Sequence, residues 1–77
     1  MNRERRKNIQ SIIDQLEELK GSVEDIQSEE EEYRDNIPEN LQGSERYETA
    51  DEAVSNLEAA VSSIEEVISY LEEAKGE

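Results

Sequence analysis

Apolar side chains recur in two stretches of the chain, with alternating steps of three and four residues. The first stretch comprises Ile9, Ile12, Leu16, Leu19, Val23, Ile26 and Tyr33, and the second comprises Tyr47, Ala50, Val54, Leu57, Val61, Ile64, Ile68 and Leu71. A mean spacing of about 3.5 residues is typical of helices that pack as a coiled coil. Members of the two stretches lie equally far from Asn40, so that Ile9 matches Leu71 and Tyr33 matches Tyr47. The pattern predicts an all-α fold, an antiparallel two-helix hairpin of coiled-coil type with these residues in its core.

The residues between the two stretches predict where the first helix ends. Pro38 disfavours the helical conformation of Ile37, so we expect the first helix to span about residues 3–35. Residues 36–43 then form the turn, where Ile37 and Leu41 are expected to cover the open end of the core. Whether this turn only closes the hairpin or also acts as a recognition loop stays open.

The second helix has a start and a stop signal. Ser44 is suited to accept a hydrogen bond from the first free backbone N–H groups, which places the helix at about residues 45–75. Lys75 in the last turn and Gly76 just beyond it are the residue types expected at a helix end. Residues 1–77 are therefore predicted to form a single helical hairpin domain, and two helices alone bury too little apolar surface for high stability, so assembly into a larger helical bundle is expected.

With Ile9 and Val54 at heptad position a, one flank of the hairpin is charged. Position e carries Ile13, Lys20, Gln27 and Arg34 on the first helix and Asp51, Glu58, Glu65 and Glu72 on the second. Lys20 can reach Glu58 or Glu65, and Arg34 can reach Asp51. Such pairs favour the antiparallel register by about 0.2–1 kcal/mol each.

The opposite flank, positions g and c, has no charge on the second helix beyond residue 52. We define the neutral strip by its members there: Ala53, Asn56, Ala60, Ser63, Val67, Tyr70 and Ala74. Small side chains permit close approach of another helix, and an aromatic side chain is a common interface anchor. One interpretation is that the strip packs against a second copy, which makes the protein a homo-oligomer, or against another protein partner. The alternative is a widened apolar stripe that deepens the core of the hairpin.

Negative charge is concentrated around the turn. The chain has a net charge of −14, and residues 24–52 carry −10 of it. We call this part the acidic end, and its acidic residues are Glu24, Asp25, Glu29, Glu30, Glu31, Glu32, Asp35, Glu39, Glu45, Glu48, Asp51 and Glu52. Along the helix axis one charge falls about every 2 Å, close to the value of about 1.7 Å for duplex DNA. A rod of this charge density can occupy a basic channel built for nucleic acid, whereas the simpler interpretation is that acidity serves solubility.

Two smaller sets of charges carry their own expectations. Arg3, Arg5, Arg6 and Lys7 open the first helix, and we expect the neighbouring carboxylates of Glu72, Glu73 and Glu77 to neutralise them. Glu30 falls on core position a, opposite Ala50. Either the helices separate there, or Arg46 or Arg34 pairs with Glu30 in a polar layer.

The composition argues against chemistry. The chain contains no cysteine and no histidine, which removes thiolates, imidazole bases and the usual zinc ligands. A helical hairpin has no enclosed pocket in which two carboxylates could acquire separate pKa values, and no spacing of calcium-loop type is present. We therefore predict no enzymatic activity, no catalytic residues, no metal and no cofactor. Without an apolar stretch of about 20 residues or a signal peptide, the protein is expected in the cytoplasm, away from membranes.

The turn and its surroundings resemble a family of sequences. Residues 31–48 read EEYRDNIPENLQGSERYE, and residues 53–58 read AVSNLE. This turn between two glutamate-rich helices resembles small acidic helical-hairpin proteins of phages and prophages of Gram-positive bacteria, over about residues 12–74. The resemblance implies a phage context and no residue role. Anti-CRISPR and anti-restriction proteins of phages are similar in size, and some of them imitate DNA.

The expected function is therefore that of a small acidic phage-type binding protein. It would inhibit a host protein that handles nucleic acid or serves in defence, with DNA mimicry as one mechanism, without binding nucleic acid itself. Its contact with that partner would be made by the acidic end or by the neutral strip. The alternative is a structural or adaptor coiled coil that acts only by self-assembly.

Overall fold

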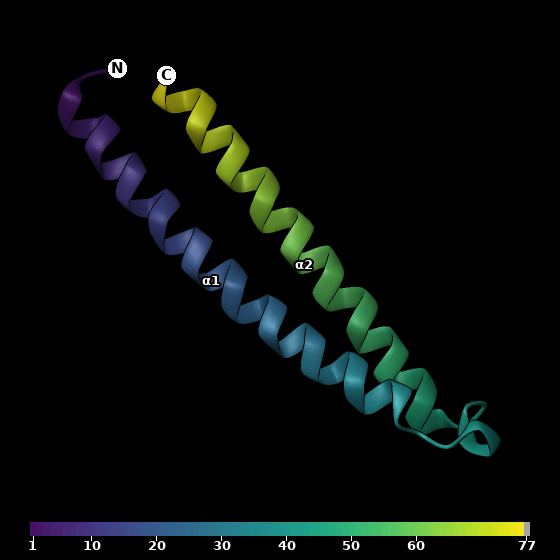
Figure 1. Cartoon of the computed structure of the whole chain (residues 1–77). Helices are drawn as coiled ribbons and strands as arrows, with labels where there is room; N and C mark the ends of the chain where they lie inside the picture. Colours follow the sequence, from purple (N-terminus) through teal and green to yellow (C-terminus); the bar gives the residue numbers. More distant parts are fainter. Residues whose placement is uncertain (77) are drawn as a thin grey trace.

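The computed structural model describes residues 1–76, and these form one antiparallel helical hairpin (Figure 1). Helix α1 spans Arg3–Asp35, a short 3-10 turn η1 spans Glu39–Leu41, and helix α2 spans Glu45–Lys75. The two helices run side by side, so that both termini lie at one end of a rod and the turn lies at the other. The rod measures 59 × 15 × 14 Å between Cα atoms. The predicted all-α hairpin is confirmed.

Local hydrogen bonds account for the helix ends. The Arg5 backbone N–H donates to Asn2 Oδ1 at 2.8 Å at the start of α1, and the Tyr47 N–H donates to Ser44 Oγ at 3.4 Å at the start of α2. Gly76 ends α2 in the left-handed conformation with φ 76°, which glycine adopts without the steric penalty of a Cβ atom. The helices begin and end where these residue types predict.

The connection closes the hairpin with one buried side chain. Ile37 is 4% exposed and covers the end of the core, as expected from the sequence. The Leu41 N–H donates to the Pro38 carbonyl at 2.8 Å, which winds the chain into η1. Leu41 itself is 44% exposed, so the prediction that it covers the core is wrong. Of the two connection residues expected to cover the core, Ile37 is the one that is buried.

Few side chains are fully enclosed between the helices. The buried apolar residues are Ile13, Ile37, Ala50, Val54 and Ile68. Helix α2 contributes from positions a and d, as the heptad pattern predicts. Helix α1 contributes Ile13 from position e, at 3% exposure. The core is therefore asymmetric, with one helix turned about its axis relative to the expected register.

The rotation of α1 overturns half of its predicted core. The four residues at position d are about half exposed: Ile12 47%, Leu19 58%, Ile26 53% and Tyr33 48%. At position e, by contrast, Lys20, Gln27 and Arg34 are half-buried. Positions d and e lie about 100° apart around a helix, so a single neighbouring helix cannot cover both. Position e of α1 faces α2 because Ile13 and the aliphatic stems of Lys20 and Arg34 can pack there. Position d consequently remains half exposed.

Substitutions of two adjacent isoleucines distinguish the observed rotation of α1 from the orientation that the heptad pattern predicts. Ile13→Ala removes a buried side chain and should lower the free energy of unfolding by about 2–4 kcal/mol, whereas Ile12→Ala should cost the hairpin less than about 1 kcal/mol. Urea unfolding followed by circular dichroism measures both. Measuring at two protein concentrations tenfold apart separates any contribution of self-association. Equal losses for the two variants at low concentration would contradict the rotation.

Candidate functional site

One flank of the hairpin carries the ion pairs that link the helices. Lys20 Nζ lies 3.6 Å from Glu65 Oε2, and Arg34 Nη1 donates to Asp51 Oδ1 at 2.9 Å. Both pairs join position e of α1 to position e of α2, as predicted. The hydrogen bond to Asp35, and after it the one to Asp51, raise the pKa of Arg34 above its ordinary value against the opposing effect of burial.

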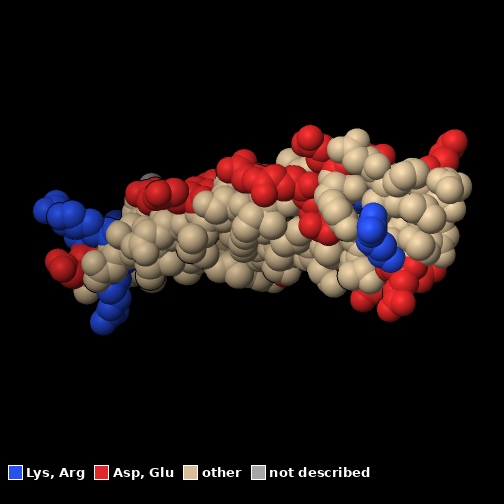
Figure 2. Space-filling model, turned by 90° about the horizontal axis from the view of Figure 1, so that it is seen from below, with Lys and Arg blue, Asp and Glu red and all other residues tan. Residues whose placement is uncertain are grey.

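The opposite flank combines rows from both helices into one surface. Since the e rows meet on the charged flank, position d of α1 and position g of α2 both lie toward the other flank. At the turn end of the rod, Tyr33 of the d row lines a shallow groove with Arg46 and Thr49 of α2, which lie within two turns before the neutral strip begins. We call this surface the uncharged face: it consists of the d row of α1 and the neutral strip of α2. On the side drawn in Figure 2, a surface free of charged residues follows the lower part of the rod between charged ends, beneath a row of acidic residues along the upper edge.

The neutral strip is open to solvent in the hairpin. Tyr70 is 68% exposed and Val67 is 45% exposed. Ala60, Ala74, Asn56 and Ser63 are also exposed, and Ala53 is half-buried. The strip therefore does not deepen the core of the hairpin. The sequence analysis did not place the d row of α1 on this surface. Ile13, which is apolar and adjacent to Ile12, is the signal that could have indicated it. An apolar residue at this position makes the apolar stripe of α1 wider than one helix can cover.

The acidic end places its carboxylates all around the rod. Glu30 and Glu31 are half-buried, and its other ten acidic residues are exposed. Among residues 1–76, only Asp35 and Asp51 of this end form ion pairs, both with Arg34. Glu30 shares the groove with Arg46, but among residues 1–76 it forms no ion pair, so of the two alternatives for this layer the pairing with Arg46 or Arg34 is not formed. The end presents a largely uncompensated negative field.

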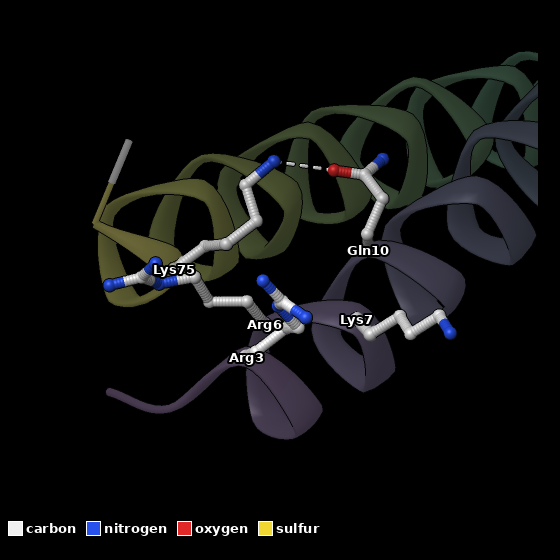
Figure 3. A pocket seen from close by; sticks show the side chains of 5 residues that line it. All are labelled: Arg3, Arg6, Lys7, Gln10 and Lys75. Atoms are coloured by element: carbon white, nitrogen blue, oxygen red, sulfur yellow. Dashed lines mark hydrogen bonds between the residues drawn. The ribbon is translucent and has the colours of Figure 1, made fainter.

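The opposite tip of the rod gathers positive charge. Arg3, Arg6 and Lys7 of α1 line a shallow groove with Gln10 and Lys75, whose ammonium group donates to Gln10 Oε1 (Figure 3).

The expected neutralisation of this tip is wrong for the part that the structure describes. None of its cations forms an ion pair with Glu72 or Glu73, which line a different groove with Ser69 and Gly76; Glu77 lies outside the described residues. The cause is the orientation of α2, which turns Lys75 toward α1 and places the two carboxylates on another side. We call the group formed by Arg3, Arg6, Lys7 and Lys75 the basic tip.

Across residues 1–76 no cluster of three or more metal-ligating side chains occurs. In the same residues, no helix combines the length and apolar character needed to cross a bilayer. The grooves lined by Tyr33, by Lys75 and by Glu72 are shallow depressions on the outside of the rod. The surfaces described above offer charge and apolar contact.

No protein-family model, no curated protein and no solved structure matches this chain.

The ion pair at the charged flank predicts a small, salt-sensitive coupling. A double-mutant cycle with Arg34→Ala and Asp51→Ala should give a coupling energy of about 0.5 kcal/mol at low salt, because both side chains are partly solvated. The coupling should fall toward zero in about 1 M NaCl, where the Debye length is about 3 Å. The measurement is urea unfolding of the four proteins, with Glu58→Ala in place of Asp51→Ala as a control that should show no coupling to Arg34. A coupling that persists unchanged in high salt would contradict a solvent-screened pair.

Proposed function

We propose that the protein is a non-enzymatic, phage-type binding protein that inhibits a host nucleic-acid-handling or defence protein by occupying its nucleic-acid-binding surface. The observation that carries this proposal is the acidic end. There a narrow, regular scaffold holds carboxylates outward with a net charge of −10 over residues 24–52. A basic channel attracts such a rod for the same reason that it attracts phosphates.

The rigidity of the scaffold supports mimicry over simple acidity. The carboxylates of the acidic end are mostly anchored on α1 and α2, two continuous helices that hold each other in one register. A folded rod loses little conformational entropy on binding, in contrast to a disordered acidic tail. Fixed spacing also lets several carboxylates meet several cations at once.

The phage context is a further part of the proposal. It rests on the resemblance of the turn sequence to small acidic phage and prophage proteins. An anti-CRISPR or anti-restriction role is consistent with the small size of the chain, its acidity and the outward carboxylates of its acidic end. In this role the protein works in the cytoplasm of the host cell, where its targets bind nucleic acid.

A second candidate function is favoured by a different observation. The half-exposed d row of α1 and the exposed neutral strip form an apolar surface on a protein with few buried residues. Such a surface is typical of helices that assemble. A structural or adaptor protein that acts only by self-assembly would use this face and have no need of the acidic end.

Partner capture and its salt dependence test the proposal. The immobilised chain should retain nucleic-acid-binding proteins from nuclease-treated host lysate, and duplex DNA should displace them. Affinity for the purified partner should fall steeply between about 50 and 500 mM NaCl. Replacing the four residues 29–32 by glutamine should reduce the slope of log affinity against log salt by up to about 4, if each carboxylate stands for one phosphate contact.

A matched control removes the same number of charges elsewhere on the rod. Its four substitutions are Glu58→Gln, Glu66→Gln, Glu72→Gln and Glu73→Gln, all at exposed positions of α2 outside the acidic end. This variant should keep most of the affinity, and both variants should keep the helical circular dichroism spectrum. Recovery of the bait alone would favour the self-assembly candidate. Equal loss of affinity in both variants would contradict a specific role of the acidic end.

A further inference from the structure

The uncharged face has the pattern of an interface that lacks its partner. Ile12, Leu19 and Ile26 recur at intervals of seven residues on α1, each about half exposed. A heptad row of large aliphatic side chains is the pattern by which a helix packs against further helices. Leu19 lines a groove with Gln15, Glu18 and Ser22. A side chain of a facing helix fits into a depression of this kind.

The dimensions of the face match a rod of similar size. Residues 12–33 extend over about 32 Å of helix, and two helices side by side are about 20 Å wide. The face therefore offers roughly 600 Å² on one molecule, or about 1,200 Å² when two molecules meet, which is the lower bound for a specific protein interface. A shorter or narrower partner would leave part of the apolar row in water.

The charges at the two ends of the rod determine which orientation of a second copy is favourable. The basic tip carries Arg3, Arg6, Lys7 and Lys75, whereas the acidic end carries a net −10. Arg5 continues the d row of α1 at the basic tip, and Glu29 lies on the adjoining g row at the acidic end. A parallel arrangement would bring two acidic ends together. An antiparallel arrangement places the basic tip of one copy beside the acidic end of the other.

We propose that a second copy of this chain covers the uncharged face in antiparallel orientation, forming a symmetric four-helix dimer. The two-fold axis passes near the middle of the face, close to Leu19 of α1 and Ala60 of α2. Ile12 of one copy then lies near Ile26 of the other. This inference does not depend on the proposed inhibitory function, since it concerns a different surface.

Two adjacent alanines provide a test of the face. Ala60 belongs to the neutral strip, whereas Ala59 lies at position f, on the outside of α2, and both are exposed. The wild-type chain should sediment as a dimer at about 50 μM. Ala60→Glu should raise the dimer dissociation constant at least about 100-fold, because the symmetry buries two carboxylates in an apolar interface. Ala59→Glu adds the same charge to the same helix and should leave the dimer within about threefold of wild type.

Single cysteines test the orientation, since the chain has none of its own. Under mild oxidation, a mixture of Ile12→Cys and Ile26→Cys should form the mixed disulfide, and Leu19→Cys should form a disulfide with itself. Ile12→Cys alone should stay unlinked, because its two copies lie about 20 Å apart along the rod. Efficient self-linking of Ile12→Cys would overturn the antiparallel arrangement. A monomeric wild-type chain at 50 μM, or equal dimerisation of Ala59→Glu and Ala60→Glu, would overturn the dimer.

Discussion

A helix can bury only as much of its circumference as its neighbours cover, and in this hairpin each helix has one neighbour. Helix α1 carries apolar residues at positions a and d and a further one, Ile13, at position e, which makes its apolar stripe wider there than α2 alone can enclose. In the structure Ile13 is buried, and Lys20 and Arg34, which follow it at position e, are half-buried. The d row is left half exposed as a consequence. The molecule therefore has two unlike sides, with ion pairs on one flank and the uncharged face, which includes the half-exposed d row, on the other.

Net charge varies along the length of the rod, whereas apolar character varies around its circumference. Ion pairs occupy the charged flank, whereas net charge varies from the basic tip to the acidic end. The exposed carboxylates would repel those of any second copy brought alongside in parallel, so the same charge that supports mimicry also constrains assembly. A dimer would carry twice the net charge of −14 along the same 59 Å rod, which is one charge per about 2 Å. Duplex DNA has one per about 1.7 Å. Assembly would therefore bring the whole rod, and not only its acidic end, to a charge density near that of nucleic acid.

Most of the fold was predictable because it depends on local chemistry and on symmetry within the sequence. Pro38, Ser44 and Gly76 act on their own neighbours, and the mirrored spacing about Asn40 requires an antiparallel pair. The e-row ion pairs followed from the same register. The rotation of α1 did not follow, because a heptad template treats positions a and d as the interior and cannot weigh a single Ile13 against Ile12. The basic tip was mispredicted for a related reason: the carboxylates near in sequence to Lys75 lie on another side of α2. The outward placement of the acidic end needed no such detail, since its helical carboxylates are spread over six of the seven heptad positions.

The two surfaces impose compatible demands on the molecule. The uncharged face follows the length of the rod, so a partner that covers it leaves the turn and the carboxylates on the opposite flank in solvent. In the proposed dimer the acidic ends would point in opposite directions, separated by the length of the helices. Each end would keep a strongly negative field, because the neighbouring basic tip contributes few cations against a net −10. Two such ends on one rigid body can engage two sites of a target, or two copies of it, which raises affinity without any new contact. Self-assembly and inhibition are thus separate properties of this chain that its geometry allows to act together.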